Sequence, residues 1–352
     1  MTSIPLAPEL EKLLNEGRNT AIISHFNPDG DAIGSTVGML RYLRDKGQDP
    51  VPVIPSPIPS FLDFLDPERE IVRYTEDEKK AKDAIRGAEL IICLDFNSLK
   101  RTEWMAELIG SSTAAKVLID HHPNPDREKF DLIISRPDAS STCELLYLTL
   151  MSFPSIDADP SRLSHGTLTA LATGIITDTN NFNNSITPDT FIIASDMLRL
   201  GVDFDTINSL VFKRYSESRM RLMGRLLTDS MAVDSRLGAS TMVITLKDKE
   251  EFNFADGDSE GFVNLPLMIR DVEVSALFSE TQDYIRVSLR SKGHVSVNAL
   301  SSAYFNGGGH ARAAGGRLYM PVSQVREYFL KSLEQFLQSN WEKPSEAAPE
   351  EK

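Results

Sequence analysis

The sequence predicts an α/β protein: a doubly wound parallel sheet, joined by a linker helix to a smaller α+β domain. Helix-like and strand-like segments alternate through about the first two hundred residues, as expected when crossover helices connect parallel strands. Short apolar runs, typical of strands buried on both faces, end in polar residues at three places: 20–24, 90–94 and 117–119. After residue 230 the pattern changes to that of a compact mixed domain.

The larger domain is expected over residues 1–205, where each element follows from a local pattern. Thr20–Ser24 predicts the first strand, and a helix is expected over Ser35–Lys46. Five prolines in Pro50–Pro59 indicate an extended surface connection. A helix is expected over Glu76–Arg86, before the strand at Cys93. Another is expected over Thr142–Ser152, after the strand at Ile133, where the hydroxyls of Ser140, Ser141 and Thr142 cap its start.

A single linker helix is expected over 206–230, where apolar residues follow helical spacing among arginines and lysines. The smaller domain then occupies 231–341, and the Glu- and Pro-containing segment 342–352 is expected to be a disordered acidic tail. The strands expected in the smaller domain are Ala239–Leu246, Glu273–Phe278, Ile285–Leu289 and Leu318–Met320, with a final helix over Val322–Gln338.

Metal-capable side chains follow four apolar segments. The residues are His25, Asp29 and Asp31 after the first strand, Asp95 after Leu90–Leu94, the block Asp120-His121-His122 after Val117–Ile119, and Asp178 after Leu171–Thr177. Because adjacent parallel strands lie roughly 4.8 Å apart, side chains at neighbouring strand ends are expected to share one rim of the sheet, where such folds bind ligands.

These residue types suit a pair of divalent ions. Two ions about 3.5–4 Å apart activate water near neutral pH and neutralise charge on a phosphoryl group under attack. The set offers imidazoles and carboxylates without a thiolate, which favours Mn²⁺, with Mg²⁺ or Co²⁺ as alternatives. Singly, Asp31, Asp95 and Asp178 each read more simply as a helix cap or turn residue, but together with the Asp-His-His block they favour a metal centre.

The four motifs resemble those of the DHH phosphoesterase family, named after the block at 120–122. They are His25 to Ser35, Leu94 to Asn97, Asp120 to Pro123 and Gly174 to Thr179. The resemblance implies that His25, Asp29 and Asp95 hold one ion, that Asp31, Asp95, His121 and Asp178 hold the other, and that Asp95 bridges both. It also implies that His122 faces the substrate phosphate and that Asp120 orients the neighbouring imidazole.

A second signature, Asn306–Gly316, packs five glycines around one histidine and one arginine. Consecutive glycines allow backbone N–H groups to bind an anion, although a flexible turn is the commoner explanation. The run resembles the C-terminal DHH-associated domain, whose loop closes over the substrate, so the active site is expected in a cleft between domains. The residues this resemblance assigns to substrate are Arg290, Gly308, Gly309, His310 and Arg312, with an ordinary solvated strand end as the alternative for Arg290.

Composition limits the partners. The 37 basic and 51 acidic residues give a formal charge of −14, and no dense basic run occurs, which argues against binding long nucleic acids. No secretory signal or membrane-spanning run is evident. Cys93 and Cys143 lie in apolar stretches without a pairing pattern, as expected of reduced thiols in the cytoplasm.

Within the family, the architecture resembles the nanoRNases. The implied function is metal-dependent hydrolysis of short oligoribonucleotides to mononucleotides and of 3′-phosphoadenosine 5′-phosphate (pAp) to AMP. Hydrolysis of linear or cyclic di-AMP is the first alternative. A pyrophosphatase and a non-catalytic nucleotide sensor are further alternatives. The resemblance also favours a homodimer, and no membrane partner is expected.

Overall fold

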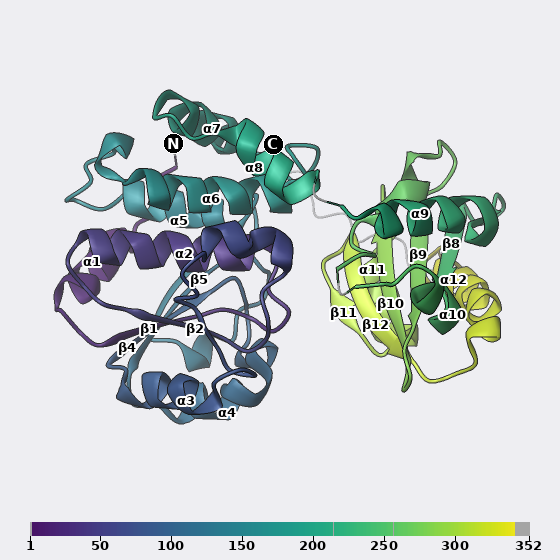
Figure 1. The fold of residues 1–352 in the computed structure, drawn as a ribbon, viewed down its shortest axis with the longest axis horizontal. Coiled ribbons are helices and arrows are strands. Elements are labelled where there is room, and N and C mark those ends of the chain that lie inside the picture. The colour runs from purple at the N-terminus through teal and green to yellow at the C-terminus, as the bar shows by residue number, and fades with distance from the viewer. Residues whose placement is uncertain (1, 214, 256, 342–352) are drawn as a thin grey trace, which may run out of the picture. The chain divides into compact units, whose positions relative to one another are not determined.

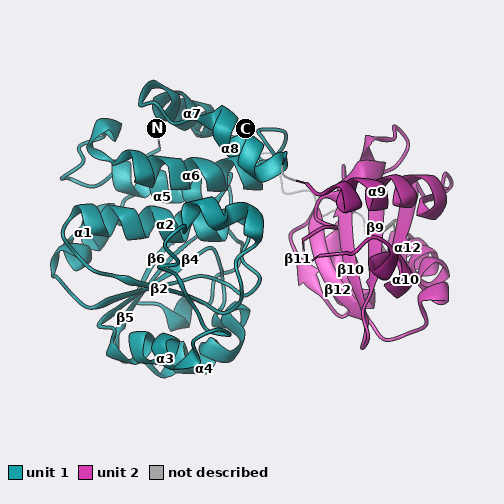
Figure 2. Ribbon diagram, in the orientation of Figure 1, with its two compact units in different colours: residues 1–214 teal, residues 215–352 magenta. Residues whose placement is uncertain are grey.

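The computed structural model describes residues 2–213, 215–255 and 257–341 (Figure 1). The expected acidic tail, 342–352, lies outside the described residues. The chain divides into two compact units, residues 1–214 and 215–352 (Figure 2). The predicted fold class is confirmed, because the first unit contains a parallel sheet covered by helices and the second, smaller unit contains a mixed sheet.

The sheet of the first unit has six parallel strands in the order β3-β2-β1-β4-β5-β6. The chain therefore winds outward in one direction from β1 and in the other from β4. At such a switch point the carboxyl ends of two neighbouring strands open into a crevice. The strands are β1 Thr20–Ile23, β2 Val51–Ile54, β3 Val72–Arg73, β4 Leu90–Leu94, β5 Ala115–Asp120 and β6 Leu132–Ser135.

Helices cover both faces of this sheet (Figure 1). One face carries α3 and α4; on the other, α1, α2, α5 and α6 are followed by the outer helices α7 and α8. Successive strand residues face opposite cores: Ile22 belongs to one cluster, Ala21 and Ile23 to the other. The helices are α1 Ala7–Asn15, α2 Gly30–Asp45, α3 Glu78–Gly87, α4 Ala106–Ser111, α5 Thr142–Met151, α6 His165–Asp178, α7 Pro188–Arg199 and α8 Phe204–Phe212.

Helices α2 and α6 approach each other closely because glycines line their contact. A Cβ atom added at Gly34 of α2 would lie 2.6 Å from the carbonyl oxygen of Ala170 in α6. A Cβ atom at Gly174 of α6 would lie 2.2 Å from Cys143 Sγ and 2.9 Å from Asp31 Oδ1. The glycines therefore bring Asp31 of α2 near α6, the helix that ends at Asp178.

Two expectations for the first unit are wrong. The helix expected from Ser35 begins at Gly30, because Asp29 caps it. The proline-rich stretch 50–59 contains the inner strand β2 and is not simply a surface connection. Pro52 is buried and lies opposite Ile22 of β1. Proline has no N–H to donate, but β3 pairs with β2 only from Val53 onward, so no N–H is needed at Pro52 on the β3 side.

The second unit contains a six-stranded sheet in the order β11-β12-β10-β9-β8-β7. Its strand pairs are antiparallel except β8 with β9. Apolar clusters around Phe305 and Phe329, and around Leu222 and Phe262, form its cores. The elements are α9 Glu217–Arg225, β7 Ala232–Asp234, β8 Ala239–Ile244, α10 Leu246–Glu251, β9 Val274–Glu280, β10 Ile285–Ser291, α11 Val297–Tyr304, β11 Gly308–Gly309, β12 Ala313–Leu318 and α12 Val325–Trp341.

Two elements around the second unit differ from expectation. In place of one linker helix over 206–230, the structure has α8, α9 and a short π-helical segment, Leu226–Ser230. A new helix starts because the Ser216 side chain accepts the N–H of Arg219. The last strand covers Ala313–Leu318 rather than Leu318–Met320, since alanines and glycines do not look like a strand in sequence.

Within the described residues, no helix has both the length and the apolar character needed to cross a membrane. Cys93 and Cys143 are both buried and unpaired by disulfide, as expected.

Candidate metal centre

The loop after β1 presents His25 at the switch point. His25 is 3% exposed, and its Nδ1 lies 2.9 Å from the carbonyl oxygen of Phe26. Because a carbonyl only accepts, Nδ1 carries the proton and the Nε2 lone pair of the neutral ring is directed away from it. Asp29 Oδ1 accepts the backbone N–H groups of Asp31 and Ala32 at 3.0 Å each, and thereby caps α2.

Asp95 lies between imidazoles from two different loops. It follows β4 with φ 65°, in the left-handed region that aspartate tolerates better than most residues. Its Oδ2 lies 3.3 Å from His25 Nε2, and its Oδ1 lies 3.7 Å from His121 Nε2. Thr142 Oγ1 also donates to Oδ1, at 3.0 Å. Each oxygen of this buried carboxylate therefore faces a different histidine.

Asp31 is anchored by the start of α5. Its Oδ2 accepts the backbone N–H of Thr142 at 2.6 Å, and its Oδ1 accepts that of Cys143 at 2.8 Å. The expected hydroxyl cap of α5 is present, since the Ser141 side chain accepts the N–H of Glu144. Sequence reasoning missed the two bonds to Asp31, because they join residues over one hundred positions apart.

The buried carboxylate of Glu144 fixes the turn before α5. It accepts the Ser140 hydroxyl at 2.7 Å, the Thr187 hydroxyl at 3.1 Å and the Thr190 hydroxyl. Glu144 is only 1% exposed, so these bonds satisfy a charge that would otherwise be costly to bury. The turn is thereby held where its N–H groups meet Asp31.

His121 and Asp178 complete the group around Asp31. His121 Nε2 lies 3.5 Å from Asp178 Oδ2 and 3.9 Å from Asp31 Oδ2. The apolar segment before Asp178 is helical, since Asp178 is the last residue of helix α6. Buried positions on both faces of 171–176 produce the same continuous apolar run in a helix as in a strand.

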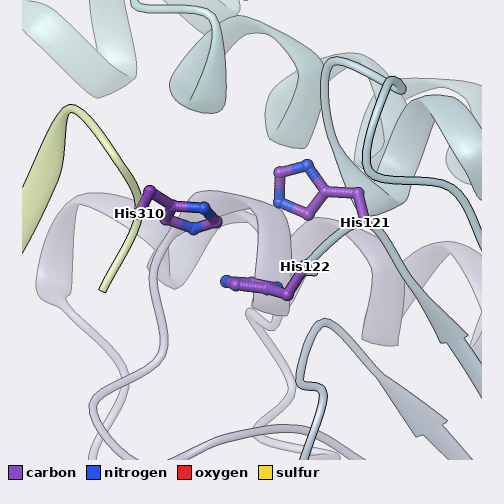
Figure 3. Close-up of side chains that lie close together, drawn as sticks. All are labelled: His121, His122 and His310. Carbon is purple, nitrogen blue, oxygen red and sulfur yellow. The ribbon is translucent and has the colours of Figure 1, made fainter. Parts of the chain in front are cut away.

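His122 stands between Asp120 and Arg101. Its Nδ1 donates to Asp120 Oδ1 at 2.7 Å, while its Nε2 lies 2.8 Å from Arg101 Nη1. Arginine only donates, so Nε2 accepts and the ring carries its proton on Nδ1. The rings of His121 and His122 meet edge to face, with centroids 4.8 Å apart (Figure 3). Arg101 was not among the residues singled out in the sequence, because no motif marks it.

The electrostatics of this cluster reflect three buried or partly buried acids, Asp31, Asp95 and Asp178, with the exposed Asp29 beside them. Burial, then the charges of Asp95, Asp178 and Asp29, raise the pKa of Asp31 well above its usual range. Burial also raises the pKa of Asp178, to about 7, although His121 opposes this. Burial opposes ionisation of Asp95 too, but the contact with His25 and the other imidazoles outweighs it and lowers the Asp95 pKa.

The pKa values of His25 and His121 are both raised. Burial alone would lower the pKa of His25, but contact with Asp95 and the charge on Asp29 raise it. For His121 the charges of Asp178 and Asp95 likewise outweigh burial. The cluster therefore favours positive charge at its centre, which protons or cations can supply.

The residues fit a pair of divalent ions. Three groups of side chains offer ligand atoms that all lie within 4.8 Å of one another: His25, Asp29 and Asp95; Asp31, Asp95 and His121; and Asp95, Asp120 and His122. Among the described residues, buried His25 Nε2 and Asp120 Oδ2 have no hydrogen-bond partner. These two atoms are therefore available to bind an ion. Nitrogen and carboxylate donors suit a hard or borderline divalent ion.

The glycine-rich segment of the second unit is a hairpin. β11 pairs Gly308 with Gly315 and Gly309 with Ala314, leaving His310 to Arg312 at the turn. Gly309 donates its backbone N–H to Asn298 Oδ1 at 2.9 Å, and His310 donates to Ala313 O at 2.7 Å. Two N–H groups of this run therefore already have partners within the chain.

Arg290 and Lys292 lie at the end of β10. Arg290 Nη1 donates to the carbonyl oxygen of Leu289 at 3.0 Å, and burial lowers its pKa. Lys292 Nζ donates to the carbonyl oxygens of Leu267, Ile269 and Arg270, so this cation holds a neighbouring segment. Arg312 is exposed.

Comparison with known proteins supports the same interpretation. Residues 19–175 match the DHH family, N-terminal domain, and residues 238–339 match the DHHA1 domain. A Thermus thermophilus protein named bifunctional oligoribonuclease and PAP phosphatase NrnA is 30% identical over 90% of this chain and 89% of the relative. A Bacillus subtilis protein of the same name is 28% identical over 84% of this chain and 88% of the relative.

The chain is also similar to a cyclic-di-AMP phosphodiesterase, GdpP of Bacillus subtilis, at 26% identity over 94% of this chain but only 49% of that relative. Among solved structures, an exopolyphosphatase-related protein from Bacteroides fragilis superposes with a TM-score of 0.90 and 34% identity, covering 96% of this chain and 99% of that one. With its two matched domains and a relative at 30% identity along most of its length, the chain belongs to the DHH phosphoesterase family.

Proposed function

We propose that this protein is a metal-dependent phosphoesterase that hydrolyses short oligoribonucleotides to mononucleotides and pAp to AMP. The observation that carries the proposal is the position of Asp95, whose two oxygens face His25 and His121 from separate loops. The relatives named oligoribonuclease and PAP phosphatase support the substrate class.

In this proposal His25, Asp29 and Asp95 hold one ion, while Asp31, Asp95, His121 and Asp178 hold the other. Two such ions, when bound, lower the pKa of water and neutralise charge on the phosphoryl group. We propose Mn²⁺, because two of the ligands are imidazoles.

The surrounding residues orient the ligands and the substrate. Asp120 keeps the His122 proton on Nδ1, which leaves Nε2 as an acceptor beside Arg101. His122 Nδ1 also lies 3.7 Å from Asp95 Oδ1, so the ring borders the proposed metal centre. Arg290, Gly308, Gly309, His310 and Arg312 are our candidates for substrate contact in the second unit. His310 and Arg312 lie at the hairpin turn between β11 and β12.

The test compares initial rates with Mn²⁺ on four substrates: a 5′-phosphorylated diribonucleotide, pAp, cyclic di-AMP and pyrophosphate. Mononucleotide release from the diribonucleotide, with AMP formed from pAp, is the expected result. Preference for cyclic di-AMP would instead support the second candidate, suggested by the GdpP similarity, and preference for pyrophosphate would contradict both. Bound metal without turnover on any substrate would favour a sensor. An Asp95→Asn variant assayed in parallel identifies any contaminating activity.

Two further expectations accompany this function. The free, buried Cys93 and Cys143 suit a reducing compartment, so we propose that the reaction takes place in the cytoplasm. We also propose a homodimer, which light scattering coupled to gel filtration would detect.

A further inference from the structure

A short segment beside the metal centre, residues 98–105, has no role in the chemistry assigned so far. Residues Leu99–Met105 form 3₁₀ turns that carry Arg101 and Trp104. The Arg101 carbonyl oxygen accepts the N–H of Phe26 at 2.8 Å, directly after His25. At the other side, Ser98 Oγ donates to Asp126 Oδ2 at 2.9 Å, in the loop that follows the Asp-His-His block. The segment is therefore attached to both loops that supply the histidines.

Arg101 provides a guanidinium group, and most of its N–H donors have no hydrogen-bond partner among the described residues. Its Nη1 lies 2.8 Å from His122 Nε2, and it pairs with no carboxylate among the residues that the structure describes. A guanidinium has five N–H donors in a planar fork that matches phosphate oxygens.

Trp104 provides an exposed aromatic face. Its ring lies nearly parallel to Tyr74, with an angle of 12° and centroids 6.3 Å apart, and meets Phe26 edge to face at 5.5 Å. The residue remains 56% exposed, more than an indole with both faces covered would show. Tyr74 and Phe26 thus hold the ring while leaving surface open to water.

The backbone before Trp104 is strained. Glu103 has φ 48° and ψ −118°, a combination that non-glycine residues rarely adopt. Strain of this kind persists where the surroundings impose it, and it is concentrated at binding sites. An exposed tryptophan held by two aromatic rings and a strained backbone indicates a surface prepared for an apolar, planar ligand.

We propose that segment 98–105 is a nucleotide subsite, in which Trp104 stacks on a nucleobase and Arg101 contacts a phosphate of the same nucleotide. This inference rests on the proposed function, because it names how the substrate's nucleoside part is held. Stacking accepts any base, since every base has an aromatic face. The subsite therefore selects for a nucleotide over a base-free phosphate without selecting one base.

The first test uses Trp104 as its own reporter. The chain has two tryptophans, so a Trp341→Phe protein reports from Trp104 alone. With Mn²⁺ present, AMP should quench its fluorescence, and ribose 5-phosphate, which lacks a base, should not. In the otherwise native chain, Trp104→Ala should weaken inhibition by AMP about 5- to 100-fold. Inhibition by ribose 5-phosphate should stay unchanged, and Trp104→Phe should recover much of the AMP affinity.

Matched controls separate stacking from general damage. Phe191→Ala removes a similarly exposed aromatic ring from α7, and AMP inhibition should not change. Arg101→Ala should weaken AMP and ribose 5-phosphate together without loss of bound Mn²⁺, and added guanidinium should restore part of that affinity. Lys100→Ala, which removes the exposed neighbouring cation, should have no such effect.

The outcomes distinguish this inference from the proposed function. Equal loss of AMP and ribose 5-phosphate in Trp104→Ala, or no loss of either, would overturn the stacking role. If no substrate is hydrolysed but AMP still quenches Trp104, the subsite stands and the proposed function fails. If the diribonucleotide is cleaved and its KM does not respond to Trp104→Ala, the function stands and the subsite fails.

Discussion

Metal-free protein should become less stable as the pH rises from about 5 to about 8. Burial raises the pKa of Asp178 to about 7, and it raises that of Asp31 as well. In this range the folded chain keeps protons that the unfolded chain has released near pH 4, so stability falls as the pH increases. The raised pKa values of His25 and His121 act in the same direction, because their stabilising protons are lost as the pH rises. The lowered pKa of Asp95 matters only below about pH 4.

The magnitude follows from Asp178. A folded pKa of about 7 lies roughly three pH units above the ordinary value. Full ionisation of Asp178 would therefore lower the free energy of unfolding by about 4 kcal/mol. The Asp178 side chain is still 29% exposed, so solvent screens part of the electrostatic cost, and we expect the free energy of unfolding to fall by about 2 kcal/mol. For a unit of this size, that lowers Tm by about 4–8 °C.

Scanning calorimetry on chelator-treated protein across this pH range measures the effect. The Asp178→Asn variant should show a flatter dependence, because the amide does not titrate. Added Mn²⁺ should reverse the slope, since ions bind ionised carboxylates more tightly as the pH rises. A Tm that stays constant or increases with pH in metal-free protein would refute the electrostatic reasoning.

Three other predictions concern individual residues. Asp95→Ala should lose bound metal and reduce kcat by more than the roughly 100-fold typical of an outer-shell partner; normal turnover with two ions bound, measured by elemental analysis, would contradict the bridging role. His310→Ala should keep its metal but weaken substrate handling, and unchanged kcat and KM on the diribonucleotide would exclude a role for the hairpin turn. Gly34→Ala should cost about 1–3 kcal/mol by calorimetry, because its Cβ would lie 2.6 Å from Ala170 O; Gly224→Ala on α9, with nothing within 4 Å, is the control and should not destabilise.

Much of the fold was predictable because its strands are short apolar runs that end in chemically distinctive residues. Asp95 and His25 each follow a strand in the structure, as the sequence indicated, and Asp120 is the last residue of β5. Asp178 shows the limit of this reasoning. A helix buried on all sides has no amphipathic period, so a continuous apolar run before an aspartate does not distinguish α6 from a strand.

The contacts that orient the site were not predictable from local sequence. Asp31 is held by the N–H groups of Thr142 and Cys143, and His122 by Arg101. Each hydrogen bond joins residues that are far apart in the sequence and are brought together only by the fold. The glycines near His310 are ambiguous in sequence for a related reason, since hairpin packing and anion binding both require residues without side chains. A Cβ atom at Gly307 would lie 1.9 Å from Gly315 O.

The close approach of α2 and α6 bears on which ion the protein accepts. Asp31 and Asp178 lie on these two helices, and the glycines at their contact leave no space for the helices to move closer. One side of the cluster is therefore rigid, whereas His121 belongs to a loop after β5. Bond lengths differ between ions, from about 2.1 Å for Mg²⁺ to about 2.4 Å for Ca²⁺. If Asp31, Asp178 and His121 share an ion as we propose, a change in ionic radius would be absorbed on the loop side. Discrimination between ions by size would then depend on helix packing as well as on ligand chemistry.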